Sequence, residues 1–282
     1  MQTNDVIWLL ERDIFHENLI RLKLAVEEQG MTAIAIPRET PWVEDRDWYG
    51  YIPDDKKGKA PSCVIYYGSI QGSHQVLKKT NWIPGVWCDT PKFTCAAYYG
   101  KLYDVLLNKE HEFLPFGLLH ARKEELYQKF GVDGCIFLRP DSGEKLFTGV
   151  IIEYEKFDEK VFDLMPYAIE QSEMLVVAKP RKIYKEYRCV IVNGVCVAQS
   201  EYKPNQQEVD FSGLSSYAEK IARIYSPESC FVVDVAETSS NGEELELIEL
   251  NSFSCSGWYQ CNLPAIVRAA SAAAIVEYDD IF

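Results

Sequence analysis

Phe231-Val-Val-Asp-Val-Ala236 and Glu246-Leu-Ile-Glu-Leu-Asn251 are two apolar runs that flank the dipeptide Asn241-Gly242. An Asn-Gly pair between such runs is the strongest short-range signal of a β-hairpin. Because side chains alternate between the two faces of a strand, Glu249 and Asn251 are expected to point the same way. The stretch therefore predicts a two-stranded hairpin with polar side chains gathered on one face.

Asp234, on the first run, completes a set of three oxygen-bearing side chains with Glu249 and Asn251. If Asp234 lies across from the other two, the hairpin presents two carboxylates and an amide at one place. Mg²⁺ typically binds one or two carboxylates together with the phosphates of a substrate. A hairpin with ordinary solvent-facing polar residues explains the same pattern, and this stretch alone leaves both interpretations open.

The chain has 282 residues, which is enough for one large domain or two ordinary ones. A net charge of −14 disfavours binding to nucleic acid or to an anionic membrane, because both require a cationic surface. No apolar run approaches the roughly 20 residues of a membrane helix. The nine cysteines form no CxxC pair, and residues 1–5 show no secretory signal. Reduced thiols and a cytoplasmic location are therefore expected.

The first part of the chain alternates strand and helix patterns, which predicts a parallel α/β sheet. The strand candidates are 6–10, 32–36, 63–67 and 84–88, and the helix candidates are 16–29, 71–79 and 94–107. The second part is expected to be α+β, because antiparallel strands alternate with helices. Its strand candidates are 135–138, 148–152, 173–178 and a hairpin over 186–202, and its helix candidates are 158–171, 215–225 and 265–276. We predict an N-terminal α/β domain over 1–115 and a second domain over 116–282.

The loop from Arg139 to Gly149 carries two cations, Arg139 and Lys145, together with glycines and hydroxyl residues. Such a composition suits a phosphate cradle, because glycines let a ligand approach the backbone closely. The spacing of a P-loop is absent. An exposed hairpin loop with solvated charges is the alternative interpretation.

The segment from Lys179 to Arg188 is the one strongly basic stretch of the sequence. Arg188 lies inside a predicted strand, with Glu186 on the same face. A cation embedded in a strand usually has an anionic partner, so Arg188 either pairs with Glu186 or another carboxylate, or faces a polyanionic ligand. Further along, Ser256 and Gly257 suit an anion-binding turn or a simple turn with capping serines.

The order of these features resembles the ATP-grasp superfamily. An Arg-Pro loop with glycine and lysine is followed by an apolar strand, a Glu-x-Arg strand, and Asp…Glu-x-Asn in the last hairpin. The resemblance is clearest over about 130–260. It points to the divergent clade that includes the eukaryotic cell-division-cycle assembly factor for translation initiation factor two and related bacterial and phage proteins. It implies an ATP-grasp fold of two α+β subdomains behind an N-terminal α/β domain.

The resemblance also implies roles for individual residues. Arg139, in the place of a more usual lysine, and Lys145 would contact ATP phosphates, and Arg188 the phosphates or an acyl phosphate; these three are the candidate catalytic residues. Glu186 would reach the ribose. The backbone of Val176, Val177, Ala178 and Lys179 would recognise adenine. Asp234, Glu249 and Asn251 would hold Mg²⁺ or Mn²⁺, and Ser256 and Gly257 would line the site.

The activity implied is ATP-dependent ligation of a carboxylate to an amine, or to another nucleophile, through an acyl phosphate. The carboxylate would belong to a small molecule, a peptide or a protein. The alternative is an ATP-binding assembly or interaction protein with little turnover.

Overall fold

The computed structural model describes residues 2, 5–14, 16–38, 46–54, 56, 62–164, 169–202, 212–239 and 244–281. Within these ranges, no helix is both long and apolar enough to cross a membrane. The chain forms two compact units, each assembled from separate segments. The first contains residues 1–89, 186–234 and 250–282, and the second contains residues 90–185 and 235–249.

The first unit contains a parallel sheet, as the alternating pattern predicts. Its strands are β1 (Ile7–Glu11), β2 (Thr32–Ile36), β3 (Cys63–Tyr67) and β4 (Ile83–Gly85), in the order β2-β1-β3-β4. Each neighbouring pair of strands is parallel. The helices α1 (His16–Glu27) and α2 (Ile70–Lys79) connect successive strands, and α7 (Leu263–Asp279) is the last helix. Parallel pairing follows from these helical crossovers, which return the chain to the same edge of the sheet.

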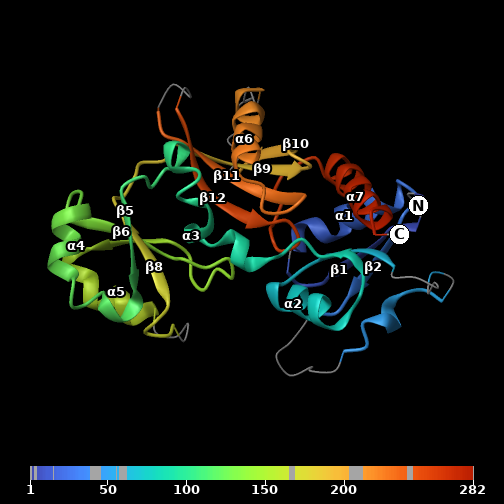
Figure 1. Cartoon of the computed structure of the whole chain (residues 1–282), viewed down its shortest axis with the longest axis horizontal. Helices are drawn as coiled ribbons and strands as arrows, with labels where there is room; N and C mark the ends of the chain where they lie inside the picture. Colours follow the sequence, from blue (N-terminus) through green and yellow to red (C-terminus); the bar gives the residue numbers. More distant parts are fainter. Residues whose placement is uncertain are drawn as a thin grey trace. The chain divides into compact units, whose positions relative to one another are not determined.

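Two apolar cores lie on opposite faces of this sheet because both faces of its strands are buried. Trp8 of β1 packs in one core with side chains of α1 and α7, whereas Leu9 packs in the other with Val76 of α2. Figure 1 shows α1 and α7 beside each other, with β1 and β2 next to them.

A second sheet follows later in the chain and contains an antiparallel pair. Strands β9 (Lys185–Val192) and β10 (Val195–Glu201) form the predicted hairpin, which turns at Asn193 and Gly194. Both turn residues have positive φ angles, as a tight hairpin requires. The sheet continues through β11 (Cys230–Glu237) and β12 (Leu245–Ser252) in the order β10-β9-β11-β12. Helix α6 (Ser212–Ile224) packs against β10.

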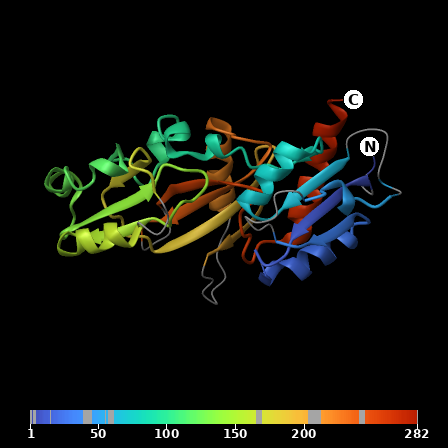
Figure 2. The same cartoon turned by 90° about the horizontal axis from the view of Figure 1, so that it is seen from below.

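The second unit is built on the sheet β5-β8-β6-β7, which is antiparallel throughout. Its strands are β5 (His111–Pro115), β6 (Cys135–Pro140), β7 (Val150–Glu153) and β8 (Met174–Ala178), and its helices are α3 (Cys95–Tyr98), α4 (Lys123–Phe130) and α5 (Phe157–Leu164). One core joins the sheet to α4 and α5, which Figure 2 shows along it in green and yellow-green. Short 3-10 helices occupy Tyr49–Tyr51, Thr90–Phe93, Tyr103–Val105, Phe116–Leu118 and Tyr154–Lys156.

The predicted α/β and α+β parts are thus confirmed, but some elements differ from their predicted bounds. The helix expected over 94–107 is only the short α3, followed by a 3-10 turn. Tyr98, Tyr99 and Leu102 are buried at helical spacing, but Gly100 follows α3 closely, and a glycine is unfavourable inside a helix. Strand β5 was not predicted, because two of its five residues are His111 and Glu112 and it ends at a proline.

The predicted hairpin turn at Asn241-Gly242 lies outside the described residues. The predicted boundary between residues 115 and 116 divides the linear chain, whereas the compact units are defined by their internal packing. That boundary remains a prediction.

Candidate functional site

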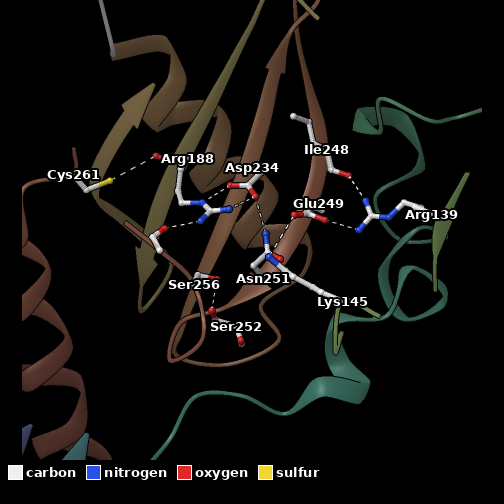
Figure 3. Close-up of polar contacts among 11 residues, drawn as sticks. Arg139, Lys145, Arg188, Asp234, Ile248, Glu249, Asn251, Ser252, Ser256 and Cys261 are labelled. Atoms are coloured by element: carbon white, nitrogen blue, oxygen red, sulfur yellow. Dashed lines mark hydrogen bonds and ion pairs between the residues drawn. The ribbon is translucent and has the colours of Figure 1, made fainter. Parts of the chain in front are cut away.

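Arg188 of β9 is held by a carboxylate on a neighbouring strand of the same sheet. Its Nε donates to Asp234 Oδ1 at 2.8 Å and its Nη2 donates to Asp234 Oδ2 at 2.7 Å, so the pair is bidentate (Figure 3). The side chains are only 6% and 2% exposed. The carboxylate partner that the sequence left open is therefore Asp234 of β11.

Asn251 of β12 also contacts this carboxylate. Its Nδ2 donates to Asp234 Oδ2 at 2.7 Å, and the residue is 3% exposed. Two of the three side chains predicted to hold a metal are therefore adjacent in the first unit. A buried carboxylate must be paired or hydrogen-bonded, because leaving its charge uncompensated in a low dielectric is costly.

The turn after β12 supplies a further partner. Arg188 Nη1 donates to the carbonyl oxygen of Gly257 at 2.6 Å, and Tyr67 Oη donates to the carbonyl oxygen of Ser256 at 2.8 Å. Ser256 Oγ donates to the carbonyl oxygen of Ser252 at 2.7 Å. The turn formed by Ser256 and Gly257 thus lies beside Arg188, and in this structure it contributes carbonyl oxygens.

Glu249, the third predicted metal ligand, contacts two cations of the second unit. Arg139 Nη2 donates to Glu249 Oε2 at 2.5 Å, and Lys145 Nζ lies 3.8 Å from Glu249 Oε1 (Figure 3). Arg139 Nη1 also donates to the carbonyl oxygen of Ile248 at 3.3 Å. The structure therefore joins the predicted phosphate-binding cations to the last strand, although Arg139 and Glu249 are 110 positions apart.

One donor of Arg139 is left over. Its Nε is buried, and among the described residues it has no hydrogen-bond partner. Lys145 lies six residues later in the chain, and its side chain is 45% exposed. Its backbone is in the left-handed region, with a φ angle of 53°. A buried guanidinium N–H beside an exposed ammonium group fits an anionic ligand with several oxygen atoms, such as a polyphosphate.

The loop between β6 and β7 is anchored within the second unit. The backbone N–H of Ala96 donates to Asp141 Oδ1 at 3.0 Å, and burial raises the pKa of Asp141. At Gly143, a Cβ atom would lie 2.3 Å from the carbonyl oxygen of Thr90. Asp141 and Gly143 therefore fix the path of the loop that carries Lys145, a role that the sequence did not assign to them.

Strand β8 places the predicted adenine-binding residues. Val176, Val177 and Ala178 are fully buried, and β8 is paired with β5 on one side and β6 on the other. These two ladders use the backbone groups of the strand through Ala178. The first backbone groups beyond the ladders belong to Lys179, whose ammonium group forms an ion pair with Glu110.

The side chains around Arg139 on its sheet were also missed. Phe137 lies opposite Ile151 of β7, so both share a face with Arg139, whereas Ile136 and Leu138 point into the core. Ile151 is 56% exposed. The alternation of side chains along the strand indicates that Phe137 shares a face with Arg139. The sequence does not show which face of the sheet the helices cover, so the exposed face could not be identified from it.

Glu186, the predicted ribose ligand, lies near the start of the β9-β10 hairpin. Its carbonyl oxygen accepts a hydrogen bond from the N–H of Tyr202 at 2.8 Å. The carboxylate that the structure places against the Arg188 guanidinium is that of Asp234.

Each of the three predicted metal ligands carries an oxygen atom of the type that a hard divalent cation binds. Asp234, Glu249 and Asn251 offer carboxylate and amide oxygens, the ligands that Mg²⁺ binds. In the described part of the chain, no group of three or more His, Cys, Asp or Glu side chains could hold a metal ion.

Comparison with known proteins gives a family match. The model of an ATP-grasp domain, described as family 3 of the R-2-K clade, matches residues 58–270, which is most of the chain. No curated protein sequence matches the chain.

Several solved structures have a similar fold. The ATP-grasp ligase PsnB, complexed with precursor peptide PsnA2 and AMPPNP, is 10% identical over 97% of this chain and 98% of that chain, with a TM-score of 0.59. The D-cycloserine synthetase DcsG is 13% identical over 95% and 98%, with a TM-score of 0.59. The D-alanine–D-alanine ligase from Bacillus anthracis is 13% identical over 96% and 92%, with a TM-score of 0.53. The predicted fold is confirmed at this level.

Proposed function

Because the chain belongs to family 3 of the R-2-K clade of ATP-grasp domains, we propose that it is an ATP- and Mg²⁺-dependent ligase. It would join a carboxylate to an amine or another nucleophile. The observation that carries the proposal is the contact of Glu249 with both Arg139 and Lys145, beside an Arg139 Nε that lacks a partner among the described residues. This arrangement supplies acidic and basic groups together, as bound metal and phosphate require.

The reaction balances in two steps. A carboxylate oxygen of the substrate attacks the γ-phosphorus of ATP, and the bond to the β,γ-bridging oxygen breaks to release ADP. The nucleophile then attacks the acyl carbon and phosphate leaves, with loss of the proton from an amine nucleophile. The reaction needs no covalent intermediate with a side chain. The protein acts by positioning the reactants and by neutralising charge.

Arg139, Lys145 and Arg188 are the residues proposed to carry this neutralisation. Arg139 Nε and the exposed Lys145 ammonium group would bind phosphate oxygens. Arg188 would bind the terminal phosphate or the acyl phosphate. Its planar guanidinium is suited to this because it matches the spacing of two oxygen atoms.

Asp234, Glu249 and Asn251 are the residues proposed to hold Mg²⁺, with Mn²⁺ as a substitute. A bound Mg²⁺ would neutralise charge on the β- and γ-phosphates. The carbonyl groups of Ser256 and Gly257 would line the nucleotide site. Glu186 would contact the ribose.

For the base, β8 supports a narrower proposal than the sequence allowed. Because the ladders use the backbone through Ala178, the backbone from Lys179 onward is the better candidate to recognise adenine, with Val176 and Val177 as buried support. Phe137 and the exposed Ile151 would provide an apolar surface next to Arg139.

The acceptor carboxylate is proposed to belong to a peptide, a protein or a small molecule, and the setting to be the cytoplasm. The structural relative PsnB is described in complex with a precursor peptide, which supports a peptide among these classes. An ATP-binding assembly protein with little turnover is the alternative, and it predicts binding without release of ADP.

A thermal melt tests the nucleotide site. The protein is heated with ATP and Mg²⁺, with ATP and Mn²⁺, with ATP alone, with Mg²⁺ alone and with GTP and Mg²⁺. A ligand present at about 100 times its Kd stabilises a protein by roughly 2.7 kcal/mol, which gives a clear shift in Tm. We expect a shift that requires ATP together with the metal ion. No shift at millimolar ATP contradicts the proposal.

Glu249→Gln is the matching variant, with Glu246→Gln as its control. Both residues belong to β12 and both pair with an arginine, Glu249 with Arg139 and Glu246 with Arg181, but they lie on opposite faces of the strand. We expect Glu249→Gln to abolish the metal-dependent part of the ATP shift and Glu246→Gln to preserve it. Equal shifts in the two variants would remove Glu249 from the metal site.

A further inference from the structure

Tyr259 lies against the face of the Arg188 guanidinium. Arg188 Cζ is 4.6 Å from the centroid of the Tyr259 ring, which is the geometry of a cation–π contact. The edge of the guanidinium is meanwhile engaged by Asp234 and by the carbonyl oxygen of Gly257. Arg188 is therefore held along its edge and over one face.

The backbone that carries this ring is unusual. Tyr259 has a φ angle of +44°, in the left-handed region that bulky residues rarely adopt. Backbone outliers of this kind persist only where the surrounding structure enforces them, and they gather at ligand clamps and active sites. Tyr259, the residue with this backbone conformation, contacts Arg188, which is proposed to bind phosphate.

The neighbours of Tyr259 explain how the conformation is enforced. Trp258 is fully buried, with its ring centroid 4.2 Å from that of Tyr67 and 4.8 Å from that of Phe253. This anchor fixes the chain immediately before Tyr259. On the other side, Tyr202 meets the Tyr259 ring edge to face at 4.7 Å.

We propose that Tyr259 is a positioning residue that holds the Arg188 guanidinium in the orientation needed to bind the terminal phosphates of the nucleotide. This inference rests on the proposed function, because it takes the phosphate-binding role of Arg188 from it. The ring covers one face of the guanidinium and limits its rotation out of the plane set by Asp234. A fixed orientation lowers the entropy lost when a phosphate binds.

Three substitutions separate the ring from the backbone. Tyr259→Phe keeps the ring, Tyr259→Leu removes the π-face, and Tyr259→Gly removes the ring while suiting the positive φ. Tyr103→Leu is the control, since Tyr103 is 51% exposed and lies in a 3-10 turn of the second unit. Circular dichroism and Tm confirm that each variant is folded.

Isothermal titration calorimetry then measures the binding of AMPPNP with Mg²⁺ and of AMP. We expect Tyr259→Leu and Tyr259→Gly to weaken AMPPNP binding by about 2- to 30-fold, the range of a cation–π contact, and to leave AMP binding unchanged because AMP lacks the terminal phosphates. Tyr259→Phe and Tyr103→Leu should bind AMPPNP as the wild type does.

If the wild type binds AMPPNP and the Tyr259→Leu and Tyr259→Gly variants bind it with the same affinity, this inference is overturned and the proposed function stands. Parallel losses for AMPPNP and AMP also overturn it, because they indicate a structural role. Absence of AMPPNP binding by the wild-type protein overturns the proposed function and this inference with it.

Discussion

Arg188 and Asp234 form a buried ion pair whose two members depend on each other. Their side chains are 6% and 2% exposed, so each charge would be poorly solvated without the other. Removing one member of such a pair typically costs about 3–5 kcal/mol, because it leaves the other charge buried and uncompensated, whereas replacing both by apolar groups is often nearly neutral. Each charge therefore depends on the other for its stability in the folded protein.

We predict that Arg188→Met lowers the free energy of unfolding by about 3–5 kcal/mol, and that Arg188→Met combined with Asp234→Leu loses less than Arg188→Met alone. Guanidinium denaturation measures both, with Arg223→Met on the exposed side of α6 as the control, expected within about 0.5 kcal/mol of the wild type. A loss below about 1 kcal/mol for Arg188→Met would contradict the importance of this pair.

At the scale of elements, the loop between β6 and β7 depends on one glycine. A Cβ atom at Gly143 would lie 2.3 Å from the carbonyl oxygen of Thr90, which is backbone and cannot rotate away. Since the same loop carries Lys145, a shift at Gly143 moves a proposed phosphate ligand.

We therefore predict that Gly143→Ala lowers the free energy of unfolding by about 1–3 kcal/mol, which is seen as a lower Tm. The variant should also show a smaller rise in Tm when ATP and Mg²⁺ are added. Gly100→Ala is the matched control in the same unit, because a Cβ there would meet nothing within 4 Å. It should leave Tm unchanged or raise it slightly, since alanine restricts the unfolded chain. Identical melts for the two variants would show that the loop adapts to the added methyl group.

The strand patterns were reliable at this scale where apolar runs are continuous. Thr32–Ile36 and Cys63–Tyr67 form strands with the predicted limits. Strand β5 was missed because its pairing with β8, rather than its own composition, makes it a strand. The stretch 94–107 was overextended as a helix because its buried residues, among them Tyr98, Tyr99 and Leu102, keep a helical spacing, whereas α3 ends at Tyr98, just before Gly100.

At the scale of the whole molecule, burial controls the reactivity of the cysteine thiols. The nine cysteines are present as thiols: Cys63, Cys88, Cys95, Cys189, Cys230 and Cys261 are buried, and Cys135, Cys196 and Cys255 are partly exposed. Burial is the main cause that raises the pKa of Cys63 to about 12 and that of Cys261 to about 11. At a pH of about 8 both groups are almost entirely protonated, and the thiol is much less nucleophilic than the thiolate.

We predict that Ellman's reagent at a pH of about 8 reacts quickly with no more than the three partly exposed thiols of the native protein and with all nine after unfolding in guanidinium. Mass spectrometry of an alkylated digest identifies the positions. Rapid labelling of Cys63 or Cys230 in the native state would contradict the burial seen in the cores.

The sequence by itself determined the alternation of strands and helices, the basic loop around Arg139 and the acidic residues of the last hairpin. These features depend on local periodicity and composition, which a single segment contains. Only the tertiary structure decided that Arg188 pairs with Asp234, 46 positions away. It also decided that Tyr259 covers Arg188. Both contacts depend on strand order and on a left-handed turn, which are set by packing between distant segments rather than by local preference.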